Sequence, residues 1–203
     1  MSDNLIIIFM KAPVAGLVKT RLGKEIGFEK ACKIYKKFCR LIFEEVCKTG
    51  FDVEIDYYPE NGLELIRQLI APDVFLLLQD GDDLGVRMKN AFLNAFKRGY
   101  KKVLIIGSDI PEIKASIILD AFDLIQNEPV LGPCKDGGYY LIGMDEDVFN
   151  GSYFEGIKWS TESVLNDTVI RMKEAGFSPS FLTELYDIDY KSDYENFLER
   201  NMP

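Results

Sequence analysis

A run of basic residues, interrupted by proline and glycine, follows the first apolar segment of the chain. Lys11, Lys19 and Arg21 fall in this run, and Lys24 comes soon after it. An arginine holds a phosphate group with two donors and a lysine adds a point charge, so the run favours binding of a nucleotide di- or triphosphate. Its spacing matches neither the P-loop nor the dinucleotide-binding glycine motif. The alternative is a solvated loop whose charges have no function.

Acidic residues follow the later apolar segments. Asp109 comes directly after a continuous apolar run, and Asp187 and Asp189 lie near the end of the sequence. Ligands of parallel α/β folds bind at the carboxyl ends of the strands, so these carboxylates could hold a metal ion that bridges phosphates. Each of them could equally cap a turn or a helix.

A glycine-rich segment, 132–143, contains the third group of candidates, Asp136, Gly137 and Gly138. Glycine lets the backbone approach a ligand closely because it has no β-carbon. The same dipeptides also favour a plain hairpin turn. The segment therefore predicts either a ligand-lining loop or a hairpin.

The residue types that are missing limit the chemistry further. The chain has no histidine, which excludes Ser-His-Asp and Cys-His catalysis and any imidazole metal site. None of the four cysteines forms a C-x-x-C pair, and we expect those in the helical pattern 28–48 to act as small buried apolar residues. Carboxylates are thus the expected ligands of any metal, which suits Mg²⁺ or Mn²⁺.

The overall charge and the apolar runs exclude other classes of protein. With 24 basic and 33 acidic residues the net charge is −9, which argues against binding to nucleic acid or to a membrane surface. No apolar run approaches the roughly 18 residues of a membrane span. The first apolar run, 5–10, is too short for a signal peptide and has no basic residues before it. We therefore expect a cytoplasmic protein.

Strand and helix patterns alternate along the chain. Apolar runs predict strands at 5–10, 52–58, 74–79, 103–106, 129–132 and 139–143, with a late one within 180–188. Apolar residues three or four apart predict helices at 28–48, 62–70, 84–97, 115–126, 161–175 and 191–199. This alternation predicts an α/β fold with a mainly parallel sheet, in which strands 5–10 and 103–106 are central.

We expect residues 1–203 to form a single domain. The segment 129–160 breaks the alternation and could form a small β insertion. If strands 5–10 and 103–106 are both central and parallel, Lys19 and Asp109 open onto one crevice.

The order of the motifs resembles that of a known family. The segments 11–22, 84–88, 107–111, 131–143, 159–161 and 187–189 follow one another as in a bacterial and archaeal family long filed as a domain of unknown function. Some of its members are labelled glycosyltransferases. That family is placed in the nucleotide-diphospho-sugar transferase superfamily, and it is similar to the 2-phospho-lactate guanylyltransferases and the molybdenum-cofactor nucleotidyltransferases. The match covers nearly the whole chain, and 132–143 is its most specific part.

The resemblance implies a GT-A fold, with a mainly parallel mixed sheet in a three-layer α/β/α arrangement. It implies a nucleotide-binding set of residues, with the last three on the acceptor or sugar side: Lys11, Gly16, Lys19, Arg21, Arg87, Asp136, Gly137 and Gly138. Asp109 would bind the metal together with Asp189 or Asp187. Asp109, Lys19 and Arg21 would be the catalytic residues.

The superfamily implies two reactions. In nucleotidyl transfer a small phosphorylated or hydroxyl acceptor attacks a nucleoside triphosphate, and in glycosyl transfer an acceptor attacks the sugar of an NDP-sugar. Both leave charge on a diphosphate, so both suit Mg²⁺ or Mn²⁺ and nearby cations. The basic run favours nucleotidyl transfer because pyrophosphate carries more charge. Glycosyl transfer and non-catalytic nucleotide binding are the alternatives, and the base, sugar, acceptor and oligomeric state stay open.

Overall fold

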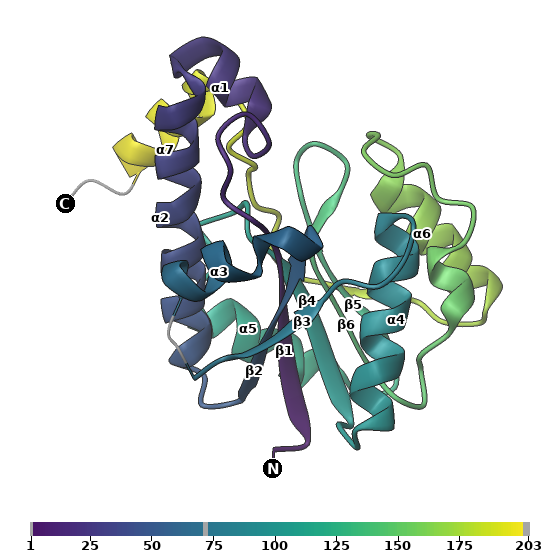
Figure 1. Cartoon of the computed structure of the whole chain (residues 1–203). Helices are drawn as coiled ribbons and strands as arrows, with labels where there is room; N and C mark the ends of the chain where they lie inside the picture. Colours follow the sequence, from purple (N-terminus) through teal and green to yellow (C-terminus); the bar gives the residue numbers. More distant parts are fainter. Residues whose placement is uncertain (1, 71–72, 201–203) are drawn as a thin grey trace.

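The computed structural model describes residues 2–70 and 73–200. At its centre is a seven-stranded sheet with the strand order β3-β2-β1-β4-β6-β5-β7 (Figure 1). The strands are β1 (Asn4–Lys11), β2 (Asp52–Tyr58), β3 (Phe75–Leu78), β4 (Lys102–Gly107), β5 (Val130–Pro133), β6 (Tyr139–Asp145) and β7 (Ser180–Phe181). β1 to β4 are parallel, and the antiparallel β6 lies between β4 and β5. The expected α/β class with a mainly parallel mixed sheet is confirmed.

Helices cover both faces of this sheet and complete the three expected layers (Figure 1). The helices on one face are α2 (Phe28–Cys47), α3 (Leu63–Leu69) and α5 (Ala115–Leu124). Those on the other face are α4 (Leu84–Lys97), η2 (Gly151–Phe154) and α6 (Val164–Glu174). A short turn, η1 (Glu60–Gly62), precedes α3. α1 (Thr20–Ile26) and α7 (Lys191–Arg200) pack on α2 around a third apolar cluster. Among the described residues no helix is long and apolar enough to cross a membrane.

The two central strands are apolar throughout because both faces of the sheet are covered. Ile6 and Ile106 belong to the core under α2 and α5, whereas Ile7 and Ile105 belong to the core under α4 and α6. All four residues are at most 3% exposed. Burying one such side chain stabilises the folded state by about 1.5–3 kcal/mol. Continuous apolar runs of this kind are typical of parallel strands that are buried on both sides.

Several boundaries differ from the sequence expectation. α1 was missed, because Leu22 and Ile26 alone give no helical stripe and tertiary contacts with α2 and α7 hold it. The late strand shrinks to β7, followed by a single bridge at Leu185, and α6 begins at Val164 rather than at 161. Cys47 is exposed, unlike the other cysteines of α2.

The segment that interrupts the strand–helix alternation contributes to the main sheet. β5 and β6 from this segment pair with each other, β6 pairs with β4, and β5 pairs with β7. The alternation breaks there because β6 runs antiparallel and needs only a short turn after β5.

Candidate active site

The antiparallel direction of β6 places the hairpin turn between β5 and β6 at the edge of the sheet where the parallel strands end. β5 runs parallel to β1 and β4, so the turn 134–138 lies at the edge where β1 and β4 end. The segment before α7 runs beside this turn, since the Lys135 N–H donates to the Leu185 carbonyl at 3.1 Å. Segments that are far apart in the sequence therefore meet at one place.

These segments surround an open cavity of about 1440 Å³. Apart from Gly16, all the predicted site residues line it: Lys11, Lys19, Arg21, Arg87, Asp109, Asp136, Gly137, Gly138, Asp187 and Asp189. Gly16 lies in the loop after β1 with φ +83°, a conformation that glycine adopts readily. The sequence-predicted residues are thus brought together around one space, with Gly16 shaping the loop beside it.

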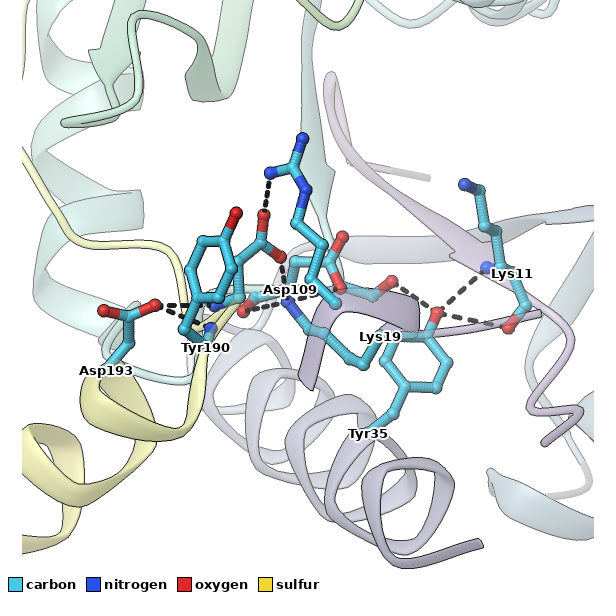
Figure 2. Close-up of polar contacts among 9 residues, drawn as sticks. Lys11, Lys19, Tyr35, Asp109, Tyr190 and Asp193 are labelled. Carbon is cyan, nitrogen blue, oxygen red and sulfur yellow. Dashed lines mark hydrogen bonds and ion pairs between the residues drawn. The ribbon is translucent and has the colours of Figure 1, made fainter. Parts of the chain in front are cut away.

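Lys19 is a buried cation between two carboxylates, as Figure 2 shows. Its side chain is 3% exposed, and Nζ lies 3.1 Å from Asp109 Oδ1 and 3.7 Å from Asp189 Oδ1. Burial alone would lower the pKa of Lys19, but the two carboxylates outweigh burial and raise the pKa, so the side chain stays charged. Its φ of 45° lies in the left-handed region, which costs a non-glycine residue on the order of 1–3 kcal/mol and persists where the surroundings impose it.

Arg21 continues the charge network toward solvent. Its Nη1 lies 2.6 Å from Asp189 Oδ2, and its side chain is 57% exposed. Asp189 raises the pKa of Arg21. The Asp193 carboxylate accepts hydrogen bonds from the Asp189 and Tyr190 N–H groups at 3.1 and 2.7 Å (Figure 2). The start of α7 therefore fixes the backbone of Asp189, whose side chain is engaged by two cations.

The carboxylates of Asp136 and Asp187 lie next to the thiol of Cys134. One ligand atom from each of the three lies within 4.8 Å of the other two. Oδ2 of Asp187 is buried and lacks a hydrogen-bond partner within the described chain. Burial raises the pKa of Asp187, and the neighbouring Asp136 carboxylate raises it further. Two close carboxylates with an unpaired buried oxygen suit a hard divalent cation such as Mg²⁺ or Mn²⁺.

The sequence left open whether Asp187 or Asp189 binds the metal, and the surroundings of the two side chains differ. Asp189 is held in ion pairs, whereas Asp187 has a free buried oxygen. Asp136, expected on the acceptor or sugar side, is a further candidate metal ligand. Sequence reasoning also missed Cys134, because an isolated cysteine just after a strand gives no signal of its neighbours.

Three more basic residues line the cavity away from the Lys19 ion pairs: Lys11, Arg87 and Lys135. The guanidinium of Arg87 lies 3.9 Å from the centroid of the Tyr58 ring, and its Nε donates to the Gly81 carbonyl at 2.8 Å. Lys11 is exposed at the end of β1. In Figure 2 Tyr35 lies between Lys11 and Asp109. Positive charge is thus spread along the cavity wall.

Gly137 is required by its neighbours in the protein. It has φ +87°, and a β-carbon there would lie 2.1 Å from the Glu162 carbonyl oxygen. The Leu165 N–H donates to the Gly137 carbonyl at 2.8 Å, and the Gly138 N–H donates to Asp136 Oδ1 at 2.9 Å. From the sequence we expected this backbone to approach a ligand closely. In the structure the backbone of Gly137 also packs closely against the segment that leads into α6.

Tyr35 is a site-supporting residue that the sequence did not reveal. The hydroxyl of this buried residue accepts from the Lys11 N–H at 3.0 Å and donates to the Lys11 carbonyl at 3.1 Å. Ser108 Oγ lies 2.8 Å from the same oxygen. The hydroxyl thereby connects the ends of β1 and β4. The sequence did not indicate this role because Tyr35 falls within the apolar stripe of α2, where a tyrosine is expected to be an ordinary core residue.

Comparisons with known proteins agree with this architecture. The protein-family model described as "Uncharacterized protein conserved in bacteria (DUF2064)" matches residues 44–161. A crystal structure from Desulfovibrio desulfuricans G20, described as a "putative nucleotide-diphospho-sugar transferase", is 35% identical with a TM-score of 0.95. The alignment covers 99% of this chain and 88% of that chain. A search of curated proteins finds no match.

More distant structures share the fold. The 4-diphosphocytidyl-2C-methyl-D-erythritol synthase of Anaerococcus prevotii is 12% identical with a TM-score of 0.63, covering 98% of this chain and 100% of that chain. Rv0371C of Mycobacterium tuberculosis H37Rv, in complex with manganese, is 13% identical with a TM-score of 0.59, covering 97% and 98%.

Proposed function

Because the chain belongs to the DUF2064 family and to the nucleotide-diphospho-sugar transferase superfamily, we propose that it is a metal-dependent nucleotidyltransferase. Membership of this superfamily confirms the expected class of enzyme, a transferase. The proposed donor is a nucleoside triphosphate and the acceptor a small phosphorylated or hydroxyl compound. The observation that carries the proposal is the pairing of a cationic loop with a carboxylate cluster across one cavity.

Lys19 and Arg21 are the residues that would bind the donor's phosphates. Lys19 lies between Asp109 and Asp189, whereas Arg21 pairs with Asp189, and the Arg21 and Asp109 side chains are each 57% exposed. Lys19 and Arg21 would orient the phosphates and stabilise the charge that develops on the leaving pyrophosphate. We assign Asp189 to positioning these two cations.

Asp109, Asp136 and Asp187 are the residues that would hold the metal ion. When bound, a divalent cation would neutralise phosphate charge and act as a Lewis acid. The donor set is dominated by oxygen, which fits Mg²⁺ or Mn²⁺. The manganese complex of the fold neighbour Rv0371C supports a divalent cation.

Glycosyl transfer from an NDP-sugar is the second candidate, and the description of the 35% identical relative favours it. We prefer nucleotidyl transfer because five basic side chains line the cavity, Lys11, Lys19, Arg21, Arg87 and Lys135. A triphosphate carries more charge than the diphosphate of an NDP-sugar and would use more of these cations.

Substitution of Asp109 tests the metal-dependent step of the proposal. We expect Asp109→Asn to lose the Mg²⁺-dependent part of nucleotide binding while keeping its fold, because the amide is a far weaker metal ligand. Calorimetric titration of the four ribonucleoside triphosphates, with and without Mg²⁺, measures this. Asp82→Asn, an exposed acid outside the cavity, is the matched control. Unchanged Mg²⁺ dependence in Asp109→Asn would show that Asp109 only caps its turn.

Substitution of Arg21 distinguishes the two reactions. Losing one charge-assisted phosphate contact costs about 1.5–3 kcal/mol, roughly ten- to a hundredfold in affinity. We expect Arg21→Ala to weaken triphosphate binding by this factor and monophosphate binding little. The control is Arg171→Ala, whose half-buried side chain lies outside the cavity. The parent protein should release pyrophosphate when a triphosphate and a suitable acceptor are supplied. Binding of UDP-glucose or GDP-mannose without triphosphate affinity would favour glycosyl transfer instead.

A further inference from the structure

One face of β2 carries a column of polar side chains directed toward α4. The residues of this column are Asp52, Glu54, Asp56 and Tyr58, which alternate with Val53, Ile55 and Tyr57 of the opposite core. Side chains alternate between the two faces of a strand, so the column lies on the α4 side of the sheet. A polar column beneath a helix needs partners, since burying polar groups without them is costly.

Three members of the column have partners from α4 or from the residues just after it. The Tyr100 hydroxyl donates to Asp52 Oδ2 at 3.2 Å, Arg98 Nη2 lies 2.6 Å from Glu54 Oε2, and the Arg87 guanidinium lies 3.9 Å from the Tyr58 ring centroid. Each of these three strand residues therefore has a hydrogen-bond donor or a cation as its partner.

Asp56 is the exception. It is 4% exposed, and its Oδ1 is buried without a hydrogen-bond partner in the described part of the chain. Burial raises the pKa of Asp56 to about 8, and the neighbouring Glu54 carboxylate contributes. An unpaired buried carboxylate is strongly unfavourable unless a positive group or donors reach it.

Asp56 lines a second cavity, of about 370 Å³, between β2, β3 and α4. Its apolar walls are Leu77, Leu78, Ala91 and Leu93, and its polar lining is Asp80, Arg87, Asn90, Asn94 and Lys97. This volume is at the lower end of the range for small-molecule sites, about 300–1,000 Å³. Arg87 lines both cavities, but its Nε is already bound to the Gly81 carbonyl.

The polar groups of this second cavity favour a ligand with several donors. The Asn90 amide nitrogen donates to the Asp80 carbonyl at 2.9 Å, which leaves the Asn90 amide oxygen as an acceptor. The Asp56 carboxyl group adds an acceptor, which becomes negatively charged when a cation takes the place of its proton. An ammonium group has three donors and no acceptor. A hard metal ion takes about six or more oxygen ligands, which suits these partly apolar walls poorly.

We propose that this second cavity binds a small primary amine, whose ammonium group pairs with Asp56 and whose carbon chain lies against Leu77, Ala91 and Leu93. The ligand supplies the partner that the other residues of the column obtain from α4 and the residues just after it. This cavity shares Arg87 with the proposed nucleotide site, but the proposal does not depend on the reaction proposed there.

Titration with n-butylammonium tests the proposal. Chemical-shift titration of the labelled protein compares butylammonium with butan-1-ol, which has the same chain without the charge. We expect the parent to prefer the amine, and Asp56→Asn to lose roughly ten- to a hundredfold of amine affinity, as for a charge-assisted contact. Asp120→Asn, an exposed acid on α5, should bind like the parent. So should Asp109→Asn, which separates this result from the nucleotide site.

Asparagine has nearly the same shape as aspartate, so we expect Asp56→Asn to fold, and circular dichroism checks this. Equal amine binding by Asp56→Asn and the parent would overturn the proposal. So would equal affinity of the parent for butan-1-ol and butylammonium, or shifts that map outside β2, β3 and α4. Absence of amine binding by the parent would overturn it as well.

Discussion

Lys19 and Asp56 are both buried ionisable residues, but the charges of their neighbours differ in effect. Lys19 lies between two carboxylates that raise its pKa despite burial. Asp56 has an acid, Glu54, as its neighbour, and burial together with that acid raises its pKa to about 8. The first side chain is held in its charged form, whereas the second is held in its protonated form over much of the neutral range.

The raised pKa of Asp56 predicts a pH-dependent stability. The folded state keeps a proton up to about pH 8, whereas the unfolded state loses it near the ordinary value of 3.8. The free energy of unfolding should therefore fall as pH rises between these values, by at most about 1.4 kcal/mol per pH unit. Asp56→Asn should remove this decline and be more stable than the parent at pH 8.

Urea unfolding of both proteins from pH 5 to 8.5 measures the difference. The charged groups around Asp56 are Glu54 on its column, Arg98 just after α4, and Asp80, Arg87 and Lys97 on the cavity wall. The pKa of Glu54 is also raised by burial, so its contribution has the same sign and persists in the variant. Parallel curves for the two proteins would contradict the prediction.

Sequence reasoning placed Lys19 and Asp109 together because each follows a central parallel strand. Their separation of 3.1 Å agrees with that expectation. Reasoning from the sequence did not show which of Asp187 and Asp189 would bind the metal. Which of two nearby acids meets the cations depends on the path of the backbone before α7, which Asp193 fixes. No property of the local sequence reports that path.

At the level of elements, α2 supports the site through a single hydroxyl. Tyr35→Phe removes the bonds from that hydroxyl to Lys11 and Ser108. We expect a loss of stability of about 1–3 kcal/mol, because buried partners lose their bonds, together with weaker nucleotide binding. Thermal unfolding and calorimetric titration measure the two effects.

Tyr153→Phe is the matched control for this prediction. The buried Tyr153 hydroxyl donates to the Val148 carbonyl at 2.9 Å, away from the large cavity. Its loss should lower stability similarly and leave nucleotide binding unchanged. If both variants bind nucleotide like the parent, Tyr35 has only a structural role.

The elements that sequence patterns missed are those that depend on distant contacts. α1 is held by α2 and α7, with the Lys191 N–H donating to Glu25 Oε2 at 2.7 Å. Within the described residues, the segment after β7 pairs with the sheet through one isolated bridge, at Leu185. The long apolar strands and the amphipathic α2 and α4 were predicted well because their periodicity is set by burial alone.

At the scale of the whole molecule, one sheet connects the N-terminal and C-terminal parts of the described chain. We propose that the chain is a single domain and expect one cooperative unfolding transition. Trp159, the sole tryptophan, lines the large cavity, so its fluorescence reports on the site while far-ultraviolet dichroism reports on the helices. The two signals should change at the same denaturant concentration. Separate midpoints would indicate that the segment around β5 and β6 unfolds independently.

The ion pairs at Lys19 also have a consequence for biosynthesis. Arg21 and Asp189 are 168 residues apart in sequence, and Lys19 and Asp109 are 90 apart. A ribosome delivers the cationic loop first, then Asp109 and later Asp189. Until Asp189 has been translated, the lysine that becomes buried has only one of its two acidic partners, and Arg21 lacks the carboxylate that it pairs with. The network of ion pairs around Lys19 therefore closes only after residue 189 has been added.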